Sequence, residues 1–230
     1  MNSSHRIYHH ITHKEAVLRV CCDKISLVTE EIIYQRKILE DYIKLQPEFL
    51  QSFKPLELRP GAPESARRMA AAATKTGLGP MASVAGVMAQ LAGEKAMKSG
   101  EKEVIIENGG DLFFHLASPA TIGIYTGIEK LAGKLAFAIE AENTPLSICA
   151  SSGKMGHSTS LGDCNLAVVS SRDAALADSA ATLAANRVKR AEDMQETAEY
   201  TANIEGVLGV MLFKDELIAM AGTLPPLIKA

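Results

Sequence analysis

The feature that most constrains the fold is a change in periodicity near residue 100, where helical spacing gives way to short apolar segments. After Lys98-Ser99-Gly100, β-branched and aromatic residues gather in short runs that turn residues separate. Runs of this length are typical of strands and are too short for independent helices. The pattern therefore predicts a sheet built from residues 104–106, 112–116, 122–125, 135–139, 146–150 and 166–169.

Segments with helical or hairpin patterns flank this strand-rich middle. Alternating apolar and polar residues predict a hairpin within residues 5–27 and a closing hairpin within residues 207–220. Because strands and helices fall in separate stretches of the chain, we expect an α+β fold in a single domain, residues 1–230. The expected helices are residues 30–45, a segment from Pro63 through Ala73, a segment from Pro80 to Ala92, and residues 173–188 and 192–201.

Charge and hydropathy exclude several classes of protein. The chain has 24 basic and 27 acidic residues, so the broad positive field that attracts nucleic acid is missing, and we expect no nucleic-acid partner. No apolar stretch approaches the roughly 20 residues that span a bilayer, and the first residues lack the apolar core of a secretory signal. We therefore expect a soluble, cytoplasmic protein with no membrane partner and with reduced cysteines.

The turn Asn108-Gly109-Gly110-Asp111 is the first candidate binding segment, because it joins two apolar strands through consecutive glycines. One interpretation is a hairpin, in which Asn-Gly supplies the positive φ angles of a type I′ turn. In the other, Gly109 and Gly110 present backbone N–H groups to a phosphate or ring edge, and Asp111 contacts a hydroxyl or a metal. Gly79, before the helix near Pro80, joins this set because glycine lets the backbone approach a ligand closely.

Residues 151–160 form the second candidate segment, with many hydroxyl groups, a lysine and a histidine between two apolar strands. The segment is not a Walker A loop, because neither the required first glycine nor the hydroxyl residue after lysine is present. Ser151, Ser152 and Gly153 remain candidates for binding a small molecule that carries phosphate. His157 could act as a general acid or base, since its reference pKa is about 6.5, or could only satisfy backbone groups within the loop.

Asp178 and Thr182 stand one turn apart in the predicted helix 173–188, so both side chains lie on one face. Magnesium accepts a carboxylate together with neutral oxygens and phosphates, which makes this pair the candidate metal site. The structural alternative is that the macrodipole favours an Asp near a helix start and that the threonine simply packs. Cys149 is either a nucleophile with a depressed pKa or a small buried hydrophobe.

Taken in order, these segments resemble the ApbE-like proteins, most of all the short, uncharacterised members of that superfamily. The resemblance implies an ApbE-like (T-fold-like) fold with mixed helices and an antiparallel-rich sheet. It rests on Gly79-Pro80-Met81-Ala82, on Glu107-Asn108-Gly109-Gly110-Asp111, on Ser151-Ser152-Gly153 with His157, and on Ala177-Asp178-Ser179-Ala180-Ala181-Thr182.

The larger relatives are FAD:protein FMN transferases, in which magnesium helps move an FMN group from FAD to a threonine or serine of an acceptor protein. The resemblance implies FAD or FMN as ligand or substrate, magnesium at Asp178 and Thr182, and a flavin beside Gly109, Gly110 and Asp111. The relatives' lysine-glycine-tyrosine motif is replaced here, with methionine after Gly79-Pro80.

The expected function is therefore binding of a flavin or another phosphate-bearing ligand with magnesium, with transferase chemistry as the implied reaction. Two alternatives stay open. One is a noncatalytic flavin- or nucleotide-binding protein, and the other is an enzyme acting on an unrelated small metabolite. The small residues of the helix from Pro80 to Ala92 also leave a homodimer open, because they permit close packing within or between subunits.

Overall fold

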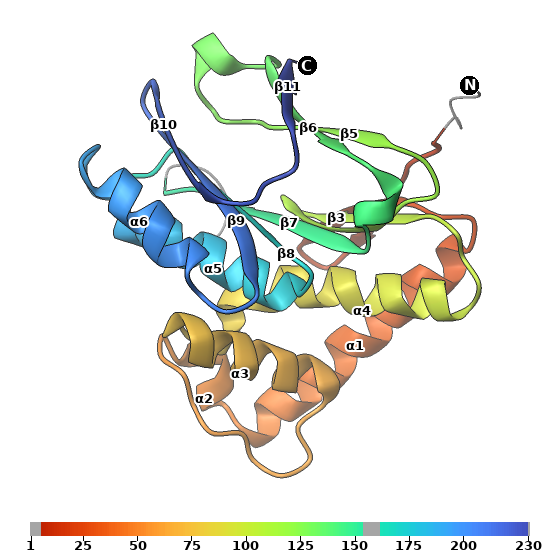
Figure 1. The fold of residues 1–230 in the computed structure, drawn as a ribbon. Coiled ribbons are helices and arrows are strands. Elements are labelled where there is room, and N and C mark those ends of the chain that lie inside the picture. Colours follow the sequence, from red (N-terminus) through yellow and green to blue (C-terminus); the bar gives the residue numbers. More distant parts are fainter. Residues whose placement is uncertain (1–5, 154–161, 230) are drawn as a thin grey trace.

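Two antiparallel sheets face each other in the computed structural model, which describes residues 6–153 and 162–229 (Figure 1). The larger sheet, in spatial order, consists of β1 (His9–His13), β2 (Ala16–Cys21), β3 (Val104–Asn108), β4 (Asp111–His115), β7 (Leu146–Ser151), β8 (Leu166–Ser171), β9 (Val207–Lys214) and β10 (Leu217–Gly222). The smaller sheet consists of β11 (Leu227–Lys229), β6 (Leu135–Ile139) and β5 (Ala120–Gly123).

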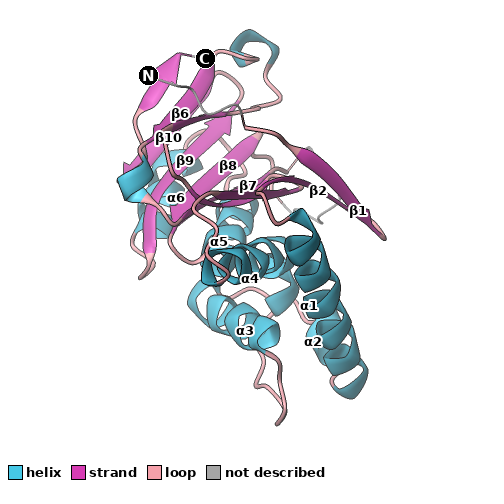
Figure 2. Ribbon diagram, turned by 90° about the vertical axis from the view of Figure 1, so that its right-hand side faces the viewer, coloured by secondary structure: helices cyan, strands magenta, loops and turns pink. Residues whose placement is uncertain are grey.

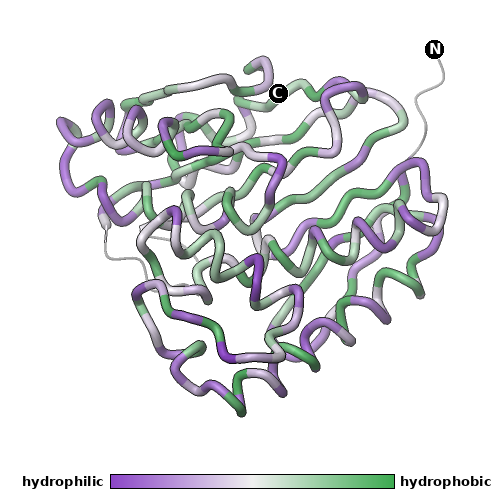
Figure 3. The backbone as a smooth tube through the Cα atoms, turned by 60° about the horizontal axis from the view of Figure 1, so that its bottom comes forward, coloured by the Kyte–Doolittle hydropathy of each residue, from purple (hydrophilic) through white to green (hydrophobic). Residues whose placement is uncertain are grey.

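Helices cover the opposite face of the larger sheet (Figure 2). Their apolar residues recur at helical spacing, so hydrophobic and hydrophilic positions alternate along the helices that border solvent (Figure 3). Within the residues that the structure describes, no helix is both long and apolar enough to cross a membrane. The helices are α1 (Ile25–Leu45), α2 (Glu48–Gln51), α3 (Glu64–Thr76), α4 (Val84–Lys98), α5 (Ala174–Arg187) and α6 (Asp193–Ala202), with short 3₁₀ turns η1 (Pro80–Ser83), η2 (Glu129–Leu131) and η3 (Ala141–Asn143).

The structure confirms the α+β class and corrects the expected single sheet. Strands β5 and β6 do not join the strands around them in the sequence; they pair with each other and with β11. The cause is burial, because Phe137 and Ile139 of β6 pack against Phe114 and Ile148 on the outer face of the larger sheet. Periodicity gives each strand an apolar face but does not say which strand it pairs with.

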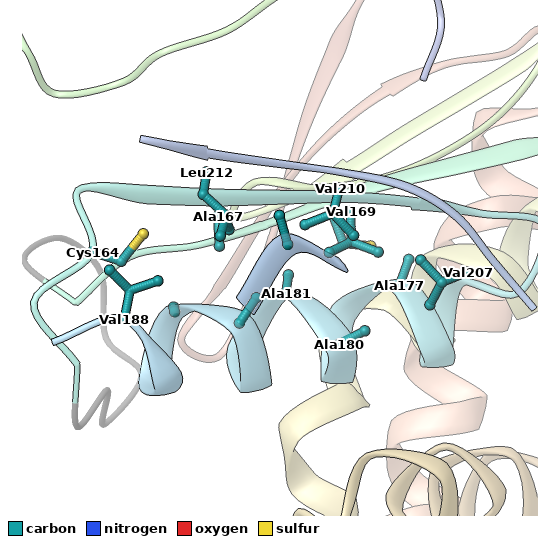
Figure 4. Close-up of a cluster of buried hydrophobic side chains, with 14 of the residues drawn as sticks. Cys164, Ala167, Val169, Ala177, Ala180, Ala181, Val188, Val207, Val210 and Leu212 are labelled. Carbon is teal, nitrogen blue, oxygen red and sulfur yellow. The ribbon is translucent and has the colours of Figure 1, made fainter. Parts of the chain in front are cut away.

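Helix α5 is the element that positions the candidate site. Its alanines are buried on both sides, which allows the helix to lie close to the sheet and to the neighbouring helices at once. Ala177 and Ala181 lie beneath Val169 and Val210 of the sheet (Figure 4). The opposite side of α5 packs against α3 and α4. Asp178 and Ser179, the polar residues that lie between these alanines, are therefore placed in the interior of the protein.

A buried hydrogen bond fixes α5 against α3, and it can be tested. The Thr76 and Ser179 hydroxyls lie 2.8 Å apart, and both residues are buried. We expect Thr76→Val to lower the free energy of unfolding by about 1–2 kcal/mol, because it leaves the Ser179 hydroxyl without this partner. Urea unfolding of both single variants and of Thr76→Val/Ser179→Ala measures the effect. Strictly additive losses in the double variant would show that the bond contributes nothing.

Candidate functional site

Asp178 lies in the second turn of α5, and its carboxylate points toward the beginning of α4. The helix itself starts at Ala174 with Asp173 as N-cap, so the interpretation of Asp178 as a residue favoured at a helix start is wrong. Instead, Asp178 Oδ2 accepts a hydrogen bond from the Gly86 N–H at 2.8 Å, and the Ala85 N–H also bonds to it. These N–H groups belong to the first turn of α4, where helices have unpaired donors. Asp178 therefore caps a different helix.

The crossing of α4 and α5 holds this carboxylate in place. A Cβ atom at Gly86 would lie 2.5 Å from the Ala174 carbonyl oxygen, so only glycine permits the observed approach. Gln90 Oε1 in turn accepts a hydrogen bond from the Ala174 N–H at 2.7 Å. Each helix thus supplies a side-chain acceptor for the first turn of the other, and the two starts are fixed together.

The Asn108-Gly109-Gly110-Asp111 turn places a second carboxylate at the same location. It is a two-residue hairpin loop in which Gly109 has φ +68° and Gly110 φ +119°, as the hairpin interpretation predicts. Asn108 Nδ2 donates to the Ala85 carbonyl at 3.1 Å, which ties the turn to α4. Asp111 is buried, and its Oδ1 atom has no hydrogen-bond partner among residues 6–153 and 162–229.

Cys149 on β7 lies beside Asp111 and also donates to the Ala174 carbonyl of α5 at 3.7 Å. The register of β4 and β7 sets it opposite Asp111, and the two side chains are hydrogen-bonded. Burial, followed by the charges of Asp111 and Asp178, raises the pKa of the Cys149 thiol well above its ordinary value. A neutral thiol is a poor nucleophile. The structure therefore favours the buried, unreactive interpretation of this cysteine.

Burial also governs the ionisation of both acids. It raises the pKa of Asp111 to about 7, against which the bonds from Cys149 and the Ala150 N–H act only in part. Burial, and then the charge of Asp111, raises the pKa of Asp178 well above its ordinary value. No basic side chain in the described part of the chain is among the groups that shift either value. Within the described ranges, the two carboxylates thus share a region without a compensating positive charge.

The serine-rich segment contributes at its first residues. Ser151 is buried, two residues beyond Cys149 on the same face of β7, and its hydroxyl has no hydrogen-bond partner in the part of the chain that is described. Ser152 is also buried. The Gly153 N–H donates to the Cys164 carbonyl at 2.9 Å, and a Cβ at Gly153 would lie 2.5 Å from the Gly162 carbonyl oxygen. His157 falls outside the described residues.

Two other predicted site residues have different surroundings. Thr182 lies one turn after Asp178 on α5 and is partly exposed. A Cβ at Gly79 would lie only 1.7 Å from the Ser52 carbonyl oxygen, so this glycine permits close approach of two segments of the chain itself. Packing thus explains Gly79 without a ligand. The sequence could not distinguish a glycine that lets a ligand approach from one that lets two chain segments approach, because both roles require a residue without a side chain.

We call Asp111, Cys149, Ser151 and Asp178, with the first turn of α4, the carboxylate site. It offers hard oxygen acceptors, two of which, Asp111 Oδ1 and Ser151 Oγ, have no hydrogen-bond partner among the described residues. Over the ranges that are described, no group of three or more His, Cys, Asp or Glu side chains is arranged to hold a metal. A cation here would therefore need hydroxyl or ligand oxygens besides the two carboxylates, as magnesium often does. Sequence reasoning missed the first turn of α4, for which small residues were the only signal.

The sequence of this chain is similar to those of known proteins. A family model described as AbpE bacteria matches residues 2–205. A UPF0280 protein of Archaeoglobus fulgidus is 36% identical over 222 residues, which cover 94% of this chain and 91% of the relative. A UPF0280 protein of Methanospirillum hungatei is 38% identical over 225 residues, covering 96% and 90% respectively.

Solved structures show the same fold at low sequence identity. The apo form of the flavinyl transferase ApbE from Pseudomonas stutzeri matches with a TM-score of 0.60 and 10% identity, over 96% of each chain. The flavin transferase ApbE from Vibrio cholerae matches with a TM-score of 0.54 and 11% identity, over 95% of this chain and 97% of the other. These likenesses confirm the ApbE-like arrangement of helices and antiparallel sheets.

Proposed function

The chain belongs to the AbpE bacteria family, and on that premise we propose that it binds a flavin nucleotide with magnesium at the carboxylate site and acts as a flavin transferase. The flavin transferases that share its fold support the class of ligand. One observation carries the proposal. Among the residues that the structure describes, Asp111 Oδ1 is buried without a hydrogen-bond partner, Asp178 is a second buried acid beside it, and no basic side chain shifts the pKa of either group. A divalent cation would compensate both charges.

The residues of the carboxylate site fit magnesium by their chemistry. Asp111 and Asp178 offer carboxylate oxygens, and Thr182 offers a hydroxyl one turn further along α5. When bound, magnesium would neutralise phosphate charge on the nucleotide. Asp178 would have a second task, because its bond to Gly86 keeps the start of α4 beside the cation. The hairpin turn would hold Asp111 in the same position through the bond from Asn108 to Ala85.

Titration of the purified protein with FAD, FMN and ADP, each with and without magnesium, tests the proposal. We expect micromolar binding of FAD that requires magnesium, with weaker binding of ADP. Incubation with FAD and a threonine-containing protein acceptor, followed by detection of covalent flavin fluorescence, then tests transfer. Magnesium-dependent binding without covalent flavin would favour the noncatalytic alternative. A protein that binds none of the three nucleotides would contradict the proposal and favour an unrelated metabolite.

A further inference from the structure

The smaller sheet ends at β5, whose outer edge pairs with no other strand in the described ranges. The Ile124 N–H donates to the Leu135 carbonyl at 2.9 Å, just beyond the β5–β6 ladder. Because bonded and non-bonded pairs alternate in an antiparallel ladder, Ile122 bonds to β6 and its two neighbours do not. Thr121 and Gly123 therefore direct their N–H and C=O groups away from β6. On β6 the same alternation sends the Ala138 N–H to the Pro226 carbonyl.

A cavity of about 120 Å³ lies beside this edge. Every residue from Ala120 to Gly123 lines it, although successive side chains of a strand point to opposite faces, so the edge backbone itself forms one wall. Ile105, Leu112 and Phe114 of the larger sheet supply an apolar floor. A cavity of roughly 150 Å³ can hold benzene. The space beside β5 therefore suits one medium-sized apolar side chain.

A second, more open depression of about 280 Å³ adjoins the first and shares Arg19 and Glu107 with it. Val17, which is 57% exposed, lies in its lining on the outer face of β2. Arg19 is paired with Glu107 at 2.9 Å and lies over the Tyr8 ring at 4.7 Å, so its charge is already neutralised within the chain. Strands β1 and β2 extend beyond the smaller sheet at this end of the molecule (Figure 2).

We propose that an extended segment of a partner protein adds to β5 as a fourth strand of the smaller sheet. Neighbouring strands lie about 4.8 Å apart, so an added strand would lie over the outer face of β2 and β3, where both depressions are found. Its backbone bonds to Thr121 and Gly123, and alternate side chains enter the depressions. Edge hydrogen bonds combined with side-chain pockets are the basis of recognition by strand addition.

The two depressions together form a groove beside β5, and its lining determines which residues the partner segment carries. The floor of the smaller cavity is apolar, the larger depression adds Val17 beside His10, and the Arg19–Glu107 ion pair that both share is internally balanced. The segment therefore carries medium-sized apolar residues at alternate positions and no charge on that face. This inference does not rest on the flavin proposal, because Leu112 faces the groove while Asp111 points to the opposite face of the sheet.

A displayed library of random 12-residue peptides, selected against the wild-type protein, supplies the probe. We expect selected peptides with alternating apolar residues, at least a tenfold weaker affinity for Thr121→Pro in fluorescence anisotropy, and unchanged affinity for Thr121→Val. Proline removes the outward N–H without breaking a bond to β6. Slower hydrogen exchange at the Thr121 and Gly123 amides on peptide binding is the second expected result. Unchanged exchange there, or equal binding by Thr121→Pro, overturns the proposal.

A charge in the groove gives an independent test that does not alter the β5 backbone. We expect Val17→Asp to weaken the same peptides at least tenfold, whereas Leu217→Asp, at a comparably exposed apolar position on β10, leaves them unaffected. Both variants retain the wild-type circular dichroism spectrum. Failure to select any peptide overturns the proposal. So does self-association that Thr121→Pro abolishes, since that result assigns the edge to a second copy of the chain.

Discussion

Replacing Asp178 with asparagine should lower the magnesium-dependent affinity for FAD by at least about 100-fold while leaving the fold intact. Asparagine keeps the shape of the side chain and an oxygen that can accept the Gly86 N–H, whose bond to Asp178 is 2.8 Å long. It removes only the negative charge that a cation would need. Calorimetric titration with and without magnesium measures the effect, and circular dichroism checks the fold.

Two further variants distinguish the effect of the Asp178 charge on FAD binding from its effect on the stability of the fold. Asp41→Asn removes an exposed carboxylate on α1 and should leave FAD binding unchanged. Asp178→Ala should lose binding as the asparagine variant does, and should also lower the free energy of unfolding by about 1–3 kcal/mol, because the Gly86 N–H then lacks an acceptor. Affinity of Asp178→Asn within threefold of wild type would remove Asp178 from the proposed metal site.

The fold could be predicted from the sequence where its determinants are local. The hairpins around Lys14 and Asp215, each with a positive φ, were predicted from short-range alternation and turn residues. Strand β11 was missed, because it is three residues long and is defined by pairing with β6 far away in the chain, as Leu227 opposite Phe137 shows. The division into two sheets depends on the same long-range pairing, which periodicity does not contain.

The site was predictable in its acidic residues and not in their contacts. The family resemblance pointed to Asp111 and Asp178, but Cys149 meets Asp111 only through the register of β4 and β7, which are separated by the whole of the smaller sheet's β5 and β6. Gly79 and Gly86 show that the sequence also does not predict which glycine lies at the site. Both permit close approach, Gly79 of Ser52 and Gly86 of α5, and only Gly86 contacts the site.

Replacing Asp111 with asparagine should stabilise the magnesium-free protein at alkaline pH. Burial raises the pKa of Asp111 from 3.8 to about 7, so the native state binds this proton more tightly than the unfolded chain does. The resulting stability is fully present below pH ~4 and is lost as the pH rises through about 7. Above that pH the charged, buried carboxylate lowers the free energy of unfolding by up to about 4 kcal/mol, an upper bound because Asp178 is coupled to it.

Urea unfolding in EDTA measures this cost directly. We expect the free energy of unfolding of Asp111→Asn to exceed that of wild type by about 2–4 kcal/mol at pH 8 and to approach it as the pH falls below about 4, where the wild-type carboxyl becomes protonated in both states. Asp41→Asn, at an exposed position, should change stability by less than about 0.5 kcal/mol at either pH.

The response to magnesium is a second measurement on the same variant, and here the wild type, not Asp111→Asn, is expected to gain stability. At pH 8 the cation should raise the melting temperature of wild type, because it binds the native state and compensates the paired carboxylates, whereas Asp111→Asn should respond little. The protein would then tolerate an unfavourable buried charge because that charge is what binds the cation, a trade between stability and function. An Asp111→Asn protein less stable than wild type at pH 8 would show that the charge is already compensated within the chain and would remove the main argument for a cation at this site.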